Sequence, residues 1–132
     1  MINDLRQLLL VTPSIVALVQ DRVFVDVAKT SSVLPRIVMH QMGSDEENDL
    51  EHSGDARTIM FDIDCEGGTG QDAFAVAEAV RLFLKDFSGA AGGAIIDAVI
   101  VNNEHSKVER TTQPGQVKQY AVTLDLDVMY RT

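Results

Sequence analysis

Five carboxylates in two alternating segments are the side chains of this sequence best suited to chemistry. Each segment contains an Asp-x-Asp pattern, Asp62 and Asp64 followed by Glu66 in one, and Asp125 and Asp127 in the other. If the two segments form neighbouring strands, the carboxylates share one surface. Carboxylate oxygens are preferred ligands of hard divalent cations, so one hypothesis is a metal site. The alternative is a solvated acidic sheet face, which we favour because no histidine or glycine pattern accompanies the carboxylates.

The remaining reactive residue types indicate structure rather than catalysis. His40, His52 and His105 have no metal-ligand spacing among themselves or with Cys65. Cys65 falls on the apolar side of its segment, which predicts a small buried side chain. The run 67–70, which contains three glycines, lacks the lysine and the spacing of a phosphate-binding loop, so we predict a turn with Thr69 as a helix cap. We therefore expect no catalytic residue, no bound metal and no cofactor, and a protein that is not an enzyme.

A strand followed by a long helix, within residues 56–87, must position the first carboxylate group. Apolar and polar residues nearly alternate from 58 to 66, which predicts a strand with one face on a core. Beyond the glycines, apolar residues recur with helical spacing and form one stripe that can cover that face. Leu82 lies opposite this stripe and Phe74 lies near its edge. They indicate a second packing surface, for the N-terminal helices or for a neighbouring subunit.

The rest of the chain predicts short helices at 2–11 and 14–20 and strands at 23–27, 36–42, 94–101 and 117–130. A Pro-Gly turn at 114–115 predicts a hairpin that sets Val128 opposite Val101 and, unfavourably, Asp125 opposite Glu104. A bulge or a projecting loop over 103–116 would relieve this contact, and we favour the loop.

Residues 44–55 contain six acids, which predicts a solvated loop between two strands. The expected fold is a single α+β domain over 1–132. It consists of a mostly antiparallel sheet of about five strands, packed on one face by one long helix, with short N-terminal helices beside it.

Composition limits the classes of partner. The chain has 132 residues and a net charge of −9, so we expect a soluble domain that nucleic acid backbones repel. No apolar run approaches the roughly 20 residues of a membrane span, and the N-terminus lacks the basic region of a signal peptide. We therefore expect no association with a membrane. A single cysteine excludes an internal disulfide.

Several short motifs follow one another over almost the whole chain. They are Ile15-Val16-Ala17-Leu18-Val19, Asp21-Arg22-Val23-Phe24, Leu34-Pro35-Arg36-Ile37-Val38, Phe61-Asp62-Ile63-Asp64-Cys65, Ala77-Glu78-Ala79-Val80-Arg81 with Leu84, and Leu124-Asp125-Leu126-Asp127-Val128-Met129-Tyr130-Arg131. Their order and spacing resemble the tail-completion proteins of tailed bacteriophages and prophages, a family related to tail-terminator and head–tail joining proteins. The chain departs from many relatives at 66–68, where Glu-Gly-Gly replaces an aromatic residue after the cysteine.

The resemblance implies a non-enzymatic virion protein that assembles as a ring, commonly a hexamer, at the head-proximal end of the tail tube. Such a ring terminates the tail and joins it to the head connector. The implied partners are copies of itself, the major tail tube protein and head connector proteins, and DNA passes through the lumen without specific binding. The implied location is the virion tail, and the host cytoplasm during assembly.

On this interpretation, the possible lumen-facing surface comprises the five carboxylates, and the possible subunit contacts are Phe74 and Leu82. Two alternatives stay open. One is another head–tail connector or head-completion protein. The other, from a different class, is a small metal- or ligand-binding domain that uses the acidic face.

Overall fold

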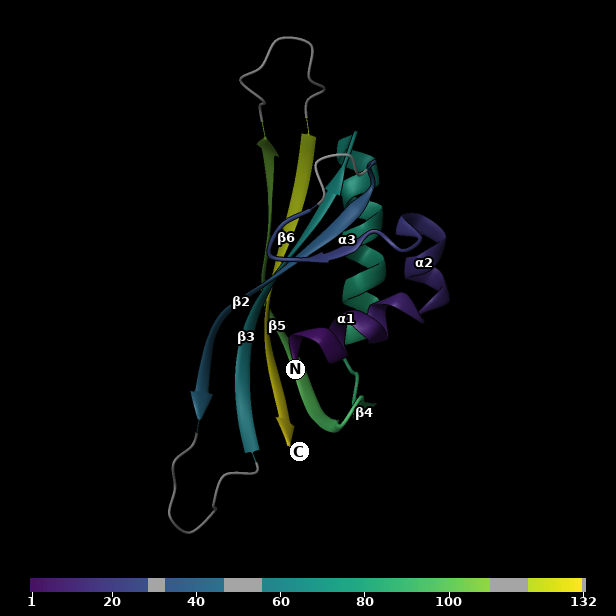
Figure 1. The fold of residues 1–132 in the computed structure, drawn as a ribbon. Helices are drawn as coiled ribbons and strands as arrows, with labels where there is room; N and C mark the ends of the chain where they lie inside the picture. Colours follow the sequence, from purple (N-terminus) through teal and green to yellow (C-terminus); the bar gives the residue numbers. More distant parts are fainter. Residues whose placement is uncertain (29–32, 47–55, 110–118, 132) are drawn as a thin grey trace.

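A curled six-stranded sheet with helices on one face forms the protein (Figure 1). The computed structural model describes residues 1–28, 33–46, 56–109 and 119–131. The strand order is β1-β2-β3-β6-β5-β4. The elements are α1 (Ile2–Leu10), α2 (Pro13–Val19), β1 (Val23–Val25), β2 (Arg36–Glu46), β3 (Ala56–Gly67), α3 (Gly70–Leu84), β4 (Gly89–Ala91), β5 (Ala94–Glu109) and β6 (Gln119–Arg131).

The α+β class is confirmed, but the sheet is mixed and has six strands. Strands β2, β3, β6 and β5 are antiparallel to one another, whereas β1 runs parallel to β2. Strand β4 was not predicted, because its Gly-Ala-Ala sequence has no apolar alternation. It exists through its pairing with β5, which a tight turn containing Gly92 at a φ of +59° makes possible.

Three helices, rather than one long helix with two beside it, cover the apolar face of the sheet (Figure 1). The predicted stripe of α3 is buried from Ala73 to Leu84. The N-terminal helices also supply core residues, since Leu5 and Leu9 of α1 and Ile15 and Val19 of α2 are fully buried. Their short apolar stripes could not show from the sequence alone that they enter the same core as α3.

In the described ranges, no single helix is long and apolar enough to cross a membrane. The pair α1 and α2 passes such a test by length and composition together, but the two helices are bent by 86°.

The predicted register of the β5–β6 hairpin is wrong by one or more residues over much of its length. Val128 pairs with Val99, and Leu126 pairs with Val101. From Glu109 to Asn103 the register already differs by one residue from the predicted one, so Asn103 rather than Glu104 faces Asp125 and the expected clash between carboxylates does not arise. Irregularities farther from the turn, between Val101 and Asn103 and between Ile96 and Ala98, shift the register again.

The favoured alternative, a projecting loop from residue 103, is also wrong. Strand β5 continues to Glu109 in ladder with β6. Strand β2 likewise extends to Glu46, beyond the predicted end at 42. The remainders of the two expected loops, 47–55 and 110–116, lie outside the described residues.

Candidate functional site

The two Asp-x-Asp segments lie on neighbouring strands and share the sheet face opposite the helices. Asp62 of β3 pairs directly with Asp125 of β6. Asp64 lies opposite Thr123, and Asp127 lies opposite Met60. Because side chains alternate along each strand, these carboxylates project to one side while Ile63 and Leu126 enter the core on the other. The sequence established the alternation, and the structure establishes that the strands are neighbours.

Asp62 has a strongly shifted pKa on this face. Partial burial raises the pKa of Asp62 to about 6, and two effects of Asp125 add to the increase: its carboxylate accepts a hydrogen bond from protonated Asp62, and its negative charge opposes ionisation. Asp64 also adds to the increase, while His105 opposes it. Asp62 therefore keeps its proton to a higher pH than an ordinary aspartate.

Two histidines flank the carboxylates. His40 Nε2 lies 3.3 Å from Asp64 Oδ2, and His105 Nδ1 lies 4.0 Å from Asp125 Oδ2. The hydroxyl of Thr123 donates to Asp64 Oδ1 at 2.6 Å. No spacing along the sequence linked these histidines to the acids. The contacts depend on strand register, which the number of residues between a histidine and an aspartate does not reveal.

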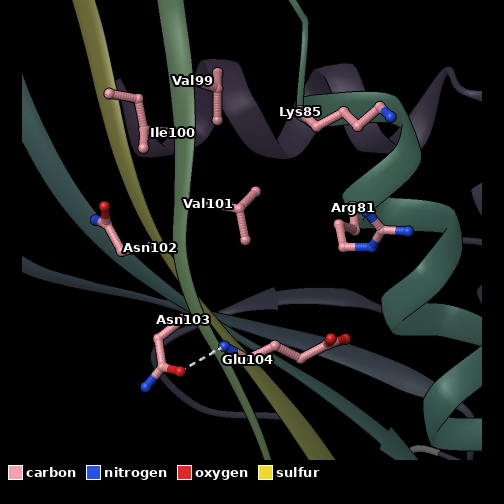
Figure 2. A pocket seen from close by; sticks show the side chains of 8 residues that line it. All are labelled: Arg81, Lys85, Val99, Ile100, Val101, Asn102, Asn103 and Glu104. Carbon is pink, nitrogen blue, oxygen red and sulfur yellow. Dashed lines mark hydrogen bonds between the residues drawn. The ribbon is translucent and has the colours of Figure 1, made fainter.

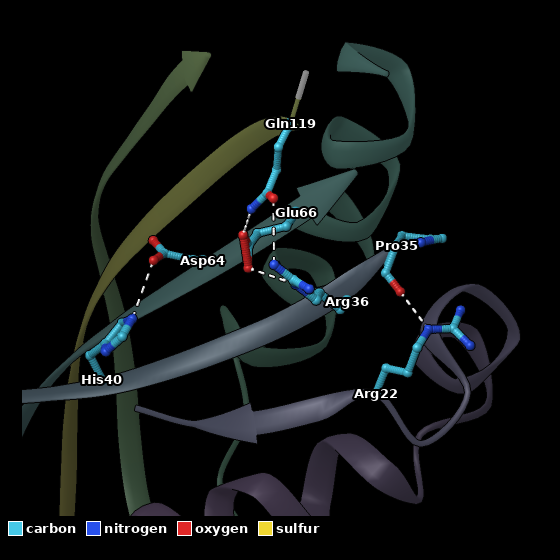
Figure 3. Close-up of polar contacts among 7 residues, drawn as sticks. All are labelled: Arg22, Pro35, Arg36, His40, Asp64, Glu66 and Gln119. Atoms are coloured by element: carbon cyan, nitrogen blue, oxygen red, sulfur yellow. Dashed lines mark hydrogen bonds and ion pairs between the residues drawn. The ribbon is translucent and has the colours of Figure 1, made fainter. Parts of the chain in front are cut away.

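Glu66 differs from the other four carboxylates because it is enclosed in a polar cluster (Figure 3). Its side chain is only 8 % exposed. Arg36 Nε donates to Glu66 Oε1 at 3.1 Å, and Gln119 Nε2 donates to Glu66 Oε2. Its charge is thus compensated within the domain, and the open acidic face consists of Asp62, Asp64, Asp125 and Asp127.

The predicted roles of Cys65 and Thr69 agree with the structure. Cys65 is fully buried, and this burial raises the pKa of its thiol well above the ordinary value. Thr69 caps α3 by accepting a hydrogen bond from the backbone N–H of Asp72 at 3.1 Å. Across the described residues, no group of three or more His, Cys, Asp or Glu side chains is arranged to hold a metal ion.

Phe74 and Leu82 are each 54 % exposed on α3. Leu82 borders a hollow of about 510 Å³ that also contacts Ser14 and Phe83. Phe74 borders one of about 210 Å³ beside Val108 and Tyr120. The N-terminal helices therefore do not bury these two side chains, and their role as subunit contacts remains a proposal.

A cleft that the sequence did not indicate lies between α3 and the outer edge of β5 (Figure 2). It encloses about 590 Å³ and is lined by Arg81 and Lys85 of the helix and by residues 99–104 of the strand. Glu78 binds Arg81 at 2.6 and 3.1 Å. Glu104 lines the same cleft, and Lys85 and Glu78 also attract each other, so the two basic side chains have acidic neighbours beside the sheet edge.

Comparison with known proteins identifies the family. No curated protein matches this chain. A chain of a solved structure described as "Virion of native gene transfer agent (GTA) particle" has a similar fold, with a TM-score of 0.67 at 14% sequence identity. The likeness covers 96% of this chain and 92% of that one. The family model described as "Tail completion protein gp17" matches residues 3–131. Because this match spans nearly the whole chain, the protein belongs to the tail completion protein gp17 family.

Proposed function

We propose that this protein is a structural component of a phage-type tail, where it forms a ring at the head-proximal end of the tail tube. The ring terminates the tail and joins it to the head connector. Membership of the tail completion family supports this role. So does the fold likeness to a chain in a structure described as the virion of a gene transfer agent particle.

The observation that carries the proposal is the division of the sheet into two unlike faces. The helices cover one face, and Asp62, Asp64, Asp125 and Asp127 project from the other. A lumen lined with carboxylates repels the phosphate backbone, so DNA can slide through without adhering. We therefore assign these four residues to the lumen or its mouth, and we expect a hexamer by resemblance to the family.

The expected partners are further copies of the chain, the major tail tube protein and head connector proteins. Phe74 and Leu82 are candidate contacts between subunits because large apolar side chains left half exposed are available for burial in an assembly. The expected location is the virion tail, reached after assembly in the host cytoplasm. No catalytic step is part of this function.

A complementation experiment tests the proposal. A phage or prophage that lacks the gene should produce tails of uncontrolled length or tails without heads, and the wild-type protein should restore complete particles. The variant with D62N, D64N, D125N and D127N should still complete tails, but it should lower the efficiency of DNA transfer. Asp21→Asn, at an exposed position after α2 and away from the acidic face, is the control. Normal tail length and head attachment without the gene would contradict the proposal.

Asp62 and Asp125 face each other across two strands, so the metal-binding alternative has a direct test. Titration calorimetry with Ca²⁺, Mg²⁺ and Mn²⁺ should show no stoichiometric binding to the wild-type protein. A saturable heat that disappears in D62N would favour a metal-binding domain. Electron cryomicroscopy of the virion separates the other alternative, since a connector or head-completion protein would lie on the capsid side of the joint.

A further inference from the structure

The sheet has two long edges that remain open. Strand β4 pairs with β5 only through Ala94–Ile96, and β1 pairs with β2 only through Ile37–Met39. Beyond these contacts, the outer edges of β5 at 97–109 and of β2 at 40–46 have no strand partner among the described residues. An open edge presents a row of backbone N–H and C=O groups that can pair with another chain.

The two open edges match each other in direction. Strands β2, β3, β6 and β5 alternate in direction, so β5 runs opposite to β2. A second copy with the same orientation, placed beside the first, therefore presents its β2 antiparallel to the β5 of the first copy. Antiparallel pairing then continues from one copy into the next without a break.

The open edges also lie at the same level along the strands. Gln41 of β2 pairs with Phe61, Phe61 pairs with Leu126, and Leu126 pairs with Val101 of β5. Gln41 and Val101 are thus on one line across the sheet, and each lies within the open part of its strand. Neighbouring copies can pair these edges with little displacement along the strand direction.

Backbone groups on both strands point to the outer side. On β2, the N–H of Ile37 donates to Arg22 O at 2.9 Å, and Met39 O accepts from the N–H of Asp26 at 2.8 Å. Alternate residues face the same edge, so Gln41 presents its backbone groups where β1 has ended. On β5, the N–H of Glu104 donates to the side chain of Asn103 at 2.9 Å rather than to a neighbouring strand (Figure 2).

These features favour a second copy as the occupant. The two open edges run in opposite directions and lie at one level, so the β5 edge of one copy fits the β2 edge of the next.

We propose that the open edge of β2 in one copy pairs with the open edge of β5 in the next copy, so that the sheets of the ring join into one closed β-barrel. This inference rests on the proposed ring function and specifies its interface. The contact is head-to-tail, the type that closes into a ring when the rotation between copies permits it. Closure removes both open edges, and the bulky helix layer takes the outer side with the acidic face inside.

Two sets of variants test the interface. Met42→Lys places a charge on the open edge of β2, and lysines on edge strands oppose pairing. Val11→Lys is the matched control. Val11 is also a large apolar side chain that is mostly exposed, but it lies between α1 and α2. Ile100→Lys places a charge on the open edge of β5 in the same way, at a side chain that is exposed in the single chain.

Assembly is measured by mass photometry over a concentration series and on purified tail tubes, after circular dichroism has shown each variant to be folded. M42K and I100K should each weaken assembly by about tenfold or more, the change that a loss of about one good contact produces. V11K should assemble like the wild type. Hydrogen exchange of the wild-type protein should show new protection at 40–46 and 98–103 on assembly.

The outcomes separate the interface from the function. Rings of normal mass that M42K and I100K do not affect, with both edges unprotected, would overturn the edge pairing and leave the ring function standing. Open filaments that protect both edges but do not cap tails would support the pairing and contradict the ring. A chain that stays monomeric at every concentration and on tail tubes would overturn both.

Discussion

The carboxyl groups of Asp62 and Asp125 face each other directly across the β3–β6 ladder, on the sheet face that the helices leave uncovered. Two like charges in this position oppose ionisation, and partial burial adds to the effect. The pKa of Asp62 is accordingly raised to about 6. A feature that suits an acidic lumen therefore has a cost in stability for the isolated domain.

This cost predicts how stability depends on pH. An unfolded aspartate has a pKa of about 3.9, so between about pH 4 and pH 6 the folded protein retains a proton that the unfolded chain has lost. The free energy of unfolding should fall as pH rises through this window. Asp62→Asn should raise the free energy of unfolding at pH 8 by about 1 kcal/mol, a value reduced for the partial solvation of the carboxyl.

Urea denaturation at pH 4 and pH 8 measures the effect. The gain of D62N should be much smaller at pH 4, where the folded carboxyl is protonated and the unfolded one is already about half protonated. Asp127→Asn is the control, because Asp127 faces Met60 rather than a carboxylate across β3. An equal gain for D62N at both values of pH would show that the pair is not the cause.

The buried ion pair between Arg36 and Glu66 predicts a large loss from a single substitution. Arg36→Ala leaves a nearly buried carboxylate without its cation and should lower the free energy of unfolding by roughly 3 kcal/mol. Replacing both residues together, as R36M/E66L, should recover much of that loss. Arg81→Ala, which breaks an exposed pair with Glu78, should change stability little in the same denaturation assay.

Gly67 and Gly68 form a matched pair at the turn before α3. A Cβ atom at Gly67 would lie 2.6 Å from the backbone N of Ala73, whereas one at Gly68 would meet nothing within 4 Å. Gly67→Ala should therefore cost about 2 kcal/mol through overpacking, and Gly68→Ala should be tolerated. Thermal melts of the two variants compare them directly, and equal melting temperatures would contradict the close approach of α3 to β3.

Cys65 should be inert in the folded protein. Its thiol is fully buried, and the resulting rise in pKa leaves little thiolate, the reactive form, at neutral pH. Iodoacetamide should label the native protein at the rate of unfolding and should label it rapidly in denaturant. Fast modification under native conditions, read by mass spectrometry, would show that the β3 strand opens locally.

Local patterns in the sequence predicted those features that depend on burial of nearby residues. The alternation in β3 and β6 and the stripe of α3 report which side chains face the core, because period two and period 3.6 follow from backbone geometry. The same reasoning placed Cys65 in the core and Thr69 at the start of α3. It also placed the four open carboxylates on the polar sides of their strands.

Pairing between distant segments was decided by the tertiary structure. Asp125 pairs with Asn103, 22 positions away along the chain, and β1 pairs with β2 in parallel. Glu66 has the same place in the alternation as Asp62, yet Arg36, 30 residues away, encloses it in a buried pair. By itself the sequence therefore determined the faces of the elements, since burial has a local period. Only the tertiary structure decided strand order, register and the two open edges, because these arise from contacts that no local period encodes.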